Sequence, residues 1–115
     1  MYKLHLPSAK TLSYLYLLTA FTYTAASYAG SNFGDVALGK QKSPSCIYCH
    51  GVTGKAPNPS YPNIDGQDAQ YLYNAMKAYQ DGHRTGPLAD MMKAQLQRLN
   101  DQDLRDVAAY FSNAK

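Results

Sequence analysis

Both cysteines of this 115-residue chain lie three positions apart, and a histidine follows the second one directly, in the order C-I-Y-C-H. The spacing C-x-x-C-H is the attachment sequence of c-type haem. The thiols of Cys46 and Cys49, one helical turn apart, can add across the two vinyl groups of one porphyrin. His50 then reaches the iron from the same face. The motif therefore predicts one covalently bound haem c, with His50 as its proximal iron ligand.

Alternative functions for the same residues have less support. A thioredoxin-like dithiol needs a βαβ context, and no strand-like alternation surrounds the two cysteines. A structural zinc site needs four ligands, and beyond residue 29 only Cys46, Cys49, His50 and His83 could supply them. Two cysteines cannot form the disulfide framework of a small secreted scaffold.

A haem iron in an electron carrier usually takes a second axial ligand from the chain, and methionine opposite histidine raises the reduction potential. Met76 stands in a helical apolar pattern and is expected to fill the core. Met91 and Met92 follow a turn-rich stretch and precede the last predicted helix, where a loop can fold back over the haem. One of these two is the expected ligand, with His83 as the alternative.

The first 29 residues differ from the rest of the chain. They carry Lys3 and Lys10 and no acid, an uncharged apolar run over 12–23, and small residues before Ala29. This pattern predicts a secretory signal peptide cleaved after Ala29, with an uncleaved anchor as the alternative. Loss of the leader lowers the formal charge from +3 to +1, which is far from the basic excess of a nucleic-acid-binding protein. The expected domain of 30–115 is small for a protein-only core, and a haem would supply the missing apolar body.

The elements around the motif are predicted to be helices. We expect them over about 33–43, 68–81 and 101–113, with a Gly- and Pro-rich loop over 51–67 and a stop or kink at Pro44. The last helix begins with a capping-box-like pair, Asn100 and Asp103. Two apolar stripes have helical spacing: Leu72, Ala75, Met76 and Tyr79, and Leu104, Val107, Ala108 and Phe111. The prediction is an all-α fold of three to four helices wrapped around one haem.

From residue 34 to its end, the chain resembles a bacterial class I cytochrome c. It is most similar to the cytochrome c-553 group and to one half of the di-haem cytochromes c-four. The resemblance rests on the segments GDVALGKQ, CIYCHG, PSYPNIDGQDAQYL and MMKAQLQRLNDQDLRDVAAYF.

The resemblance implies roles for further residues. The ligating methionine of the family stands seven residues before the Leu-Ser or Leu-Asn that opens the last helix, which selects Met92 over Met91. Pro62 matches the proline whose carbonyl accepts a hydrogen bond from the proximal histidine. Gly39 and Tyr110 match the crossing of the first and last helices. Candidates for contact with the haem propionates are Gln67, Tyr71 and Arg84. Pro44 departs from the family, which usually continues its first helix there.

These observations predict a periplasmic single-electron carrier with His/Met ligation, and not an enzyme. It would be a monomer that docks briefly with redox proteins and binds no nucleic acid. It would meet a membrane only through partner complexes or an uncleaved leader. The alternatives are a haem subunit of a periplasmic oxidoreductase complex, or a ligand sensor with an open axial position.

Overall fold

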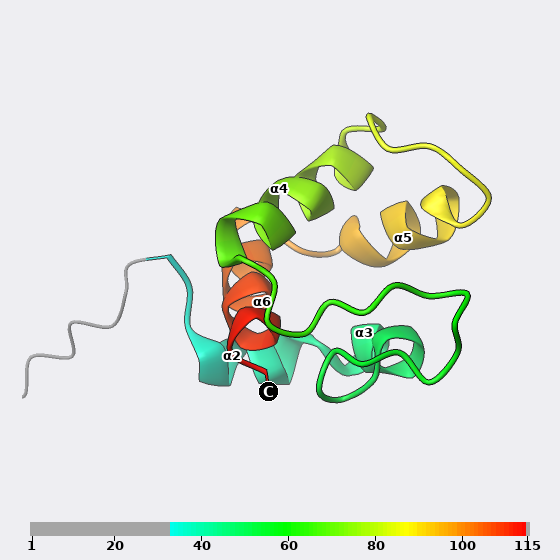
Figure 1. Ribbon diagram of the computed structural model, residues 1–115. Coiled ribbons are helices and arrows are strands. Elements are labelled where there is room, and N and C mark those ends of the chain that lie inside the picture. The colour runs from blue at the N-terminus through cyan, green and yellow to red at the C-terminus, as the bar shows by residue number, and fades with distance from the viewer. Residues whose placement is uncertain (1–32, 115) are drawn as a thin grey trace, which may run out of the picture.

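The computed structural model describes residues 33–114, and all regular structure in this range is helical (Figure 1). Its five helices are α2 (Val36–Lys42), α3 (Pro44–His50), α4 (Ala69–Gln80), α5 (Ala89–Leu96) and α6 (Asp101–Asn113). The all-α prediction is confirmed, but the described range holds five helices where three to four were expected. The predicted leader and its cleavage site lie outside the described residues.

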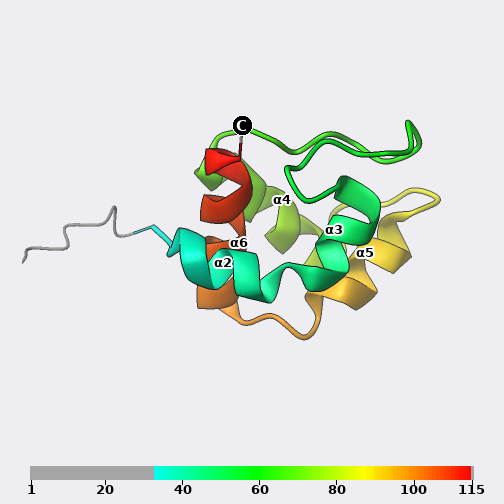
Figure 2. The ribbon, with the colours of Figure 1, turned by 90° about the horizontal axis from the view of Figure 1, so that it is seen from below.

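The helices form two layers joined by α6. Figure 1 shows α4 and α5 above, α2 and α3 below, and α6 beside both α2 and α4. Seen from below in Figure 2, α2 and α6 again lie side by side, and the predicted loop over 51–67 runs from α3 back to α4. Between residues 33 and 114, no helix has the length and apolar content needed to span a bilayer.

The crossing of α2 over α6 depends on a glycine. Gly39 is buried against α6, and a Cβ placed on it would overlap the backbone carbonyl of Asp106 and lie 2.8 Å from Cβ of Tyr110. Only a residue without a side chain allows the two helices to approach this closely. The predicted contact between Gly39 and Tyr110 is confirmed.

The predicted helix over about 33–43 and its stop before Pro44 are confirmed as α2, and the structure adds a further helix, α3, that carries the cysteine motif. α2 begins at Val36 after Asp35, whose side chain accepts a hydrogen bond from the Leu38 amide, and it ends at Lys42. Pro44 cannot donate a backbone hydrogen bond, so α2 stops, but proline is favourable in the first turn of a helix and begins α3 there. The buried Ser43 joins the two helices, and its hydroxyl donates to the carbonyl of Gly39 at 2.6 Å.

The expectation of a loop around Met91 and Met92 is wrong. Both residues lie in α5, a helix of eight residues. Its sequence ADMMKAQL consists largely of strong helix formers, but it is too short to show a clear apolar period. The helix is stabilised by tertiary burial of Ala89 and Leu96 at its two ends.

The other predicted helices are confirmed within a residue or two, as α4 and α6. α6 begins with a full capping box, in which Asn100 and Asp103 each accept a hydrogen bond from the backbone of the other. Its predicted stripe is entirely buried: Leu104, Val107, Ala108 and Phe111. Leu72 of α4 packs on this stripe with Met76 beside it. The predicted stripes therefore form the contact between α4 and α6.

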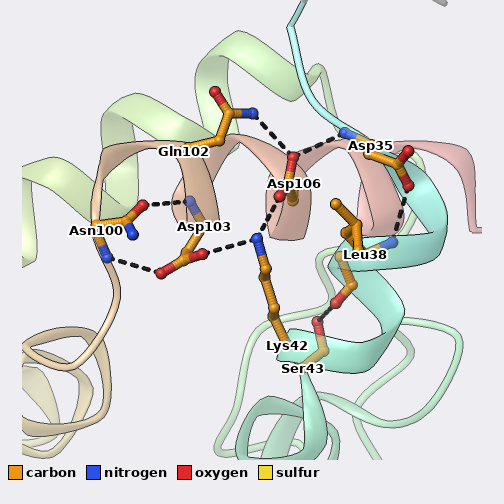
Figure 3. Close-up of polar contacts among 9 residues, drawn as sticks. Asp35, Leu38, Lys42, Ser43, Asn100, Gln102, Asp103 and Asp106 are labelled. Carbon is orange, nitrogen blue, oxygen red and sulfur yellow. Dashed lines mark hydrogen bonds and ion pairs between the residues drawn. The ribbon is translucent and has the colours of Figure 1, made fainter.

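A second set of contacts, which is polar, joins α2 to α6 (Figure 3). The Asp106 carboxylate is 1% exposed and accepts hydrogen bonds from the Asp35 amide at 2.8 Å, Lys42 Nζ at 2.5 Å and Gln102 Nε2 at 3.0 Å. Lys42 Nζ also pairs with Asp103 at 2.7 Å. The buried charge of Asp106 is therefore fully paired, as a buried carboxylate requires.

This cluster makes the stability of the protein sensitive to acid. Burial alone would raise the pKa of Asp106, but the donors from Asp35, Lys42 and Gln102 outweigh it and hold the pKa below its usual value of 3.8. The hydrogen bond from Lys42 likewise lowers the pKa of Asp103. The unfolded chain then binds more protons than the folded one below about pH 4, so stability is present above that pH and is lost as pH falls through the lowered values.

We expect Asp106→Asn to lower the free energy of unfolding at neutral pH by about 2 kcal/mol, because the ion pair with Lys42 is lost. It should also flatten the loss of stability on acidification. Denaturant unfolding of the holoprotein across the acid range, followed by circular dichroism, measures both effects. The control is Asp90→Asn on the exposed side of α5, which should change neither. An unchanged acid profile in the Asp106 variant would contradict this assignment.

Candidate cofactor site

Most of the residues that the sequence analysis proposed as haem contacts line one apolar cavity of about 440 Å³. Its walls come from α3, the 51–67 loop, α4, α5 and α6. Its size is typical of a small-molecule or cofactor site. The residues singled out in the sequence that line it are Cys46, Cys49, His50, Pro62, Gln67, Tyr71, Met76, Arg84, Met91 and Met92.

Helix α3 presents the three motif side chains to this cavity together. Cys46, Cys49 and His50 stand at positions i, i+3 and i+4 of a single helix, which places them on one face. Both cysteines are free and half-buried, whereas His50 is only 6% exposed. One short helix therefore provides two thiols and an imidazole to one wall of an apolar cavity.

The orientation of His50 is set by a backbone carbonyl. Nδ1 of His50 lies 2.9 Å from the carbonyl oxygen of Pro62. A carbonyl can only accept, so Nδ1 carries a proton, and in the neutral ring Nε2 then keeps its lone pair. Metal-binding histidines commonly have this arrangement, in which the outer nitrogen donates to a carbonyl and the inner one is free for the metal. Pro62 thus lies where the resemblance placed it.

The buried environment of Cys46 does not favour a reactive dithiol. Burial raises the pKa of the Cys46 thiol, whereas redox-active C-x-x-C pairs need a lowered pKa. A zinc site is also unsupported, because His83 is exposed and does not line the cavity. Within the described range, no group of three or more His, Cys, Asp or Glu side chains is arranged to hold a metal ion. The motif side chains fit attachment of a flat apolar group better than either alternative.

Thioethers line the side of the cavity away from α3. Met91 and Met92 come from α5 and Met76 from α4, the helices that Figure 1 shows above α3. Met91 is 47% exposed, and Met92 is half-buried. Because adjacent residues of a helix point about 100° apart, the two methionines cannot both face the centre of the cavity. Burial favours Met92 as the inward-facing side chain.

Polar side chains line the cavity alongside these apolar ones. Gln67, Tyr71 and Arg84 all contribute to the lining. The Arg84 guanidinium lies 5.0 Å from the ring centre of Tyr79, which is a cation–π contact. These groups can hydrogen-bond or pair with the carboxylates of a bound cofactor.

Sequence reasoning did not identify every residue of this site. Tyr61 also lines the cavity, with its ring edge-on to His50 at a centroid distance of 6.5 Å. Gln95 and Leu96 belong to the lining as well, through the helix that was not predicted. The turn-rich segment around Tyr61 gave no periodic signal, and only the path of the loop brings it against the histidine.

The fold and the motif have counterparts among known proteins. A family model described as "Cytochrome c" matches residues 36–115. Cytochrome c-554(548) of Halomonas halodenitrificans is 46% identical over 80 residues, which is 70% of this chain and 96% of that protein. Cytochrome c4 of Pseudomonas aeruginosa is 39% identical over 99 residues, covering 86% of this chain and 46% of that protein.

A solved structure agrees with these matches. Reduced recombinant cytochrome c4 from Pseudomonas stutzeri superposes with a TM-score of 0.63 at 39% identity, covering 71% of this chain and 46% of that one. The chain therefore spans about half the length of the c4 proteins that it matches, and nearly all of the c-554(548) protein.

Proposed function

Because the chain belongs to the cytochrome c family, as a class I c-type cytochrome related to the halves of cytochrome c4, we propose that it is a periplasmic single-electron carrier with His50 and Met92 as axial ligands. The cytochrome c family implies a covalently bound haem c, and the related cytochromes c4 and c-554 are electron-transfer proteins and not enzymes. The observation that carries the ligand assignment is the hydrogen bond from His50 to Pro62, which leaves the imidazole lone pair free in an apolar cavity lined by two free thiols.

The cavity residues have separate tasks in this proposal. Cys46 and Cys49 would tether the haem through thioether bonds, formed when each S–H adds across a vinyl group. His50 would donate its Nε2 lone pair to the iron, with Pro62 fixing the ring. A haem held by these residues would supply a one-electron redox couple. The apolar lining would limit the access of water, and the Met92 thioether as an iron ligand would favour the reduced state and raise the reduction potential.

The exposed surface near the motif fits an electron carrier. Tyr48 lies between the two cysteines, lines the cavity and is 83% exposed. The cavity therefore reaches the surface beside the proposed thioether bonds. We propose that redox partners dock there briefly, through the small contacts typical of electron transfer. Location in the periplasm rests on the leader pattern of residues 1–29.

Replacing each of the two candidate methionines separately by alanine tests which of them is the axial ligand. We expect Met92→Ala to abolish the charge-transfer absorption from methionine sulfur to ferric iron and to produce a high-spin protein that binds carbon monoxide readily. Met91→Ala, the matched control one residue away, should keep the band because its side chain is turned further toward solvent. Oxidised and reduced spectra of the purified proteins provide the measurement.

Two results would contradict the proposal. Loss of the band in Met91→Ala and its retention in Met92→Ala would reverse the assignment. A wild-type protein that is high-spin and binds carbon monoxide would instead support a ligand sensor with an open axial position.

A further inference from the structure

The helix that carries the candidate methionines has few attachments of its own. α5 packs chiefly against α4. Leu88, at its N-terminus, makes no capping hydrogen bond with its side chain. The last carbonyls of any helix lack partners within that helix and need donors from elsewhere. The donors at the end of α5 therefore bear directly on where Met92 lies.

The Leu96 carbonyl accepts from the backbone amide of Leu99 at 3.0 Å, and one side chain adds a second donor to it. Gln80, the last residue of α4, donates from Nε2 to the carbonyl of Leu96 at 2.7 Å and to that of Leu99 at 2.9 Å. Leu96 ends α5, and Leu99 lies in the short connection to α6. Both Leu96 and Leu99 also line the cavity. A single amide thus ties α4 to the end of α5 and to the segment that leads into α6.

The rest of Gln80 is held as well. Its Oε1 accepts from Lys77 Nζ at 3.3 Å, and its backbone carbonyl accepts from Gln97 Nε2 at 3.4 Å. The side chain is half-buried. Lys77 orients the amide so that its NH2 group faces the two carbonyls, because a lysine can only donate. The orientation of the amide is therefore determined by its partners.

We propose that Gln80 is a positioning residue for the axial methionine, and this inference rests on the proposed His50 and Met92 ligation. Met92 stands one turn before Leu96 in α5, so the two side chains share a face of a rigid helix. Holding the Leu96 carbonyl holds the helix turn from which Met92 reaches into the cavity. Gln80 does not line the cavity and acts through the backbone carbonyls that it holds at Leu96 and Leu99.

Loss of this hydrogen-bonding amide should weaken the bond between methionine and iron more than it weakens the fold. In Gln80→Leu, imidazole added to the ferric holoprotein should displace the methionine at about tenfold lower concentration, as expected when hydrogen bonds of ordinary net strength are lost. The charge-transfer band from sulfur to iron reports the displacement. Gln80→Glu should act in the same direction, because a carboxylate cannot donate to the two carbonyls.

Two further variants separate positioning from general stability. Gln80→Lys restores N–H donors at this position and should recover much of the resistance to imidazole. Gln97→Ala removes a neighbouring hydrogen bond at the same corner but leaves both contacts of the Gln80 amide, so its imidazole titration should match the wild type. Denaturant unfolding of each holoprotein measures global stability alongside.

The outcomes are distinct. A shift in imidazole affinity in Gln80→Leu and Gln80→Glu, with recovery in Gln80→Lys, supports the proposal. Unchanged imidazole affinity in a protein of lowered unfolding stability overturns it and leaves Gln80 a purely structural residue. A wild-type ferric protein without the band from sulfur to iron overturns the Met92 assignment itself, and this inference with it.

Discussion

A chain in which Cys46 and Cys49 are both replaced by alanine will carry no covalently attached haem. The two thiols lie on one face of α3 at the wall of the cavity, and the described part of the chain has no other cysteine that could replace them. Haem staining of the denatured protein on a gel should change from strong to absent.

The same variant should also lose most of its folded structure. An unfilled apolar cavity lowers the free energy of unfolding by about 24 cal/mol per Å³. The cavity has a volume of about 440 Å³, so leaving it empty would cost about 10 kcal/mol. That cost is comparable to the whole stability of an ordinary domain. α3, α4, α5 and α6 all contribute to the cavity wall, so their packing depends on what fills it.

Far-ultraviolet circular dichroism of the purified double variant measures this second effect, and we expect much weaker helical signal than in the holoprotein. Tyr48→Ala is the matched control, because Tyr48 lies between the two cysteines and is largely exposed. It should keep both the haem stain and the helical signal. Haem that remained with the denatured double variant would contradict the assignment of the two thiols.

The second large effect is expected at the helix crossing. Gly39→Ala should lower the free energy of unfolding by about 3 kcal/mol, at the upper end for an overpacked site. The added methyl group would overlap the backbone carbonyl of Asp106 and crowd Cβ of Tyr110. Neither atom can rotate away, because both are part of the rigid α6. The helices must then separate, which also stretches the contacts of Asp106 with α2.

Denaturant unfolding of the holoprotein measures this change. Lys40→Ala is the control on the same helix, since Lys40 is exposed and should change stability by less than about 0.5 kcal/mol. The haem spectrum at low denaturant should be the same in all three proteins, because Gly39 does not line the cavity. Equal unfolding free energies for Gly39→Ala and wild type would contradict this prediction and show that α2 and α6 can move apart at little cost.

Much of the fold could be predicted because it is encoded by local pattern. The apolar stripes of α4 and α6 follow the helical period, and the capping box at Asn100 and Asp103 uses neighbouring residues only. The pairing of Gly39 with Tyr110 was expected through resemblance to a family. The same holds for the hydrogen bond between His50 and Pro62, which is present in the structure.

The elements that were missed depend on contacts between distant segments. α5 has no clear apolar period, and it forms where Ala89 and Leu96 are buried and Gln80 binds its end. Proline predicts the end of a helix at Pro44, but in the structure α2 ends at Lys42 and Pro44 is also the first residue of α3. Tyr61 approaches His50 only through the path of an irregular loop.

The sequence by itself determined the chemistry of the cofactor. Covalent attachment needs two thiols and an imidazole within one helical turn, so five consecutive residues specify it. Tertiary structure alone decided how the far side of the site is built. Met91 and Met92 stand on α5, and the position of this helix depends on α4 and on one amide that binds two carbonyls distant in sequence. No local pattern encodes such a contact, because it exists only once both helices are in place.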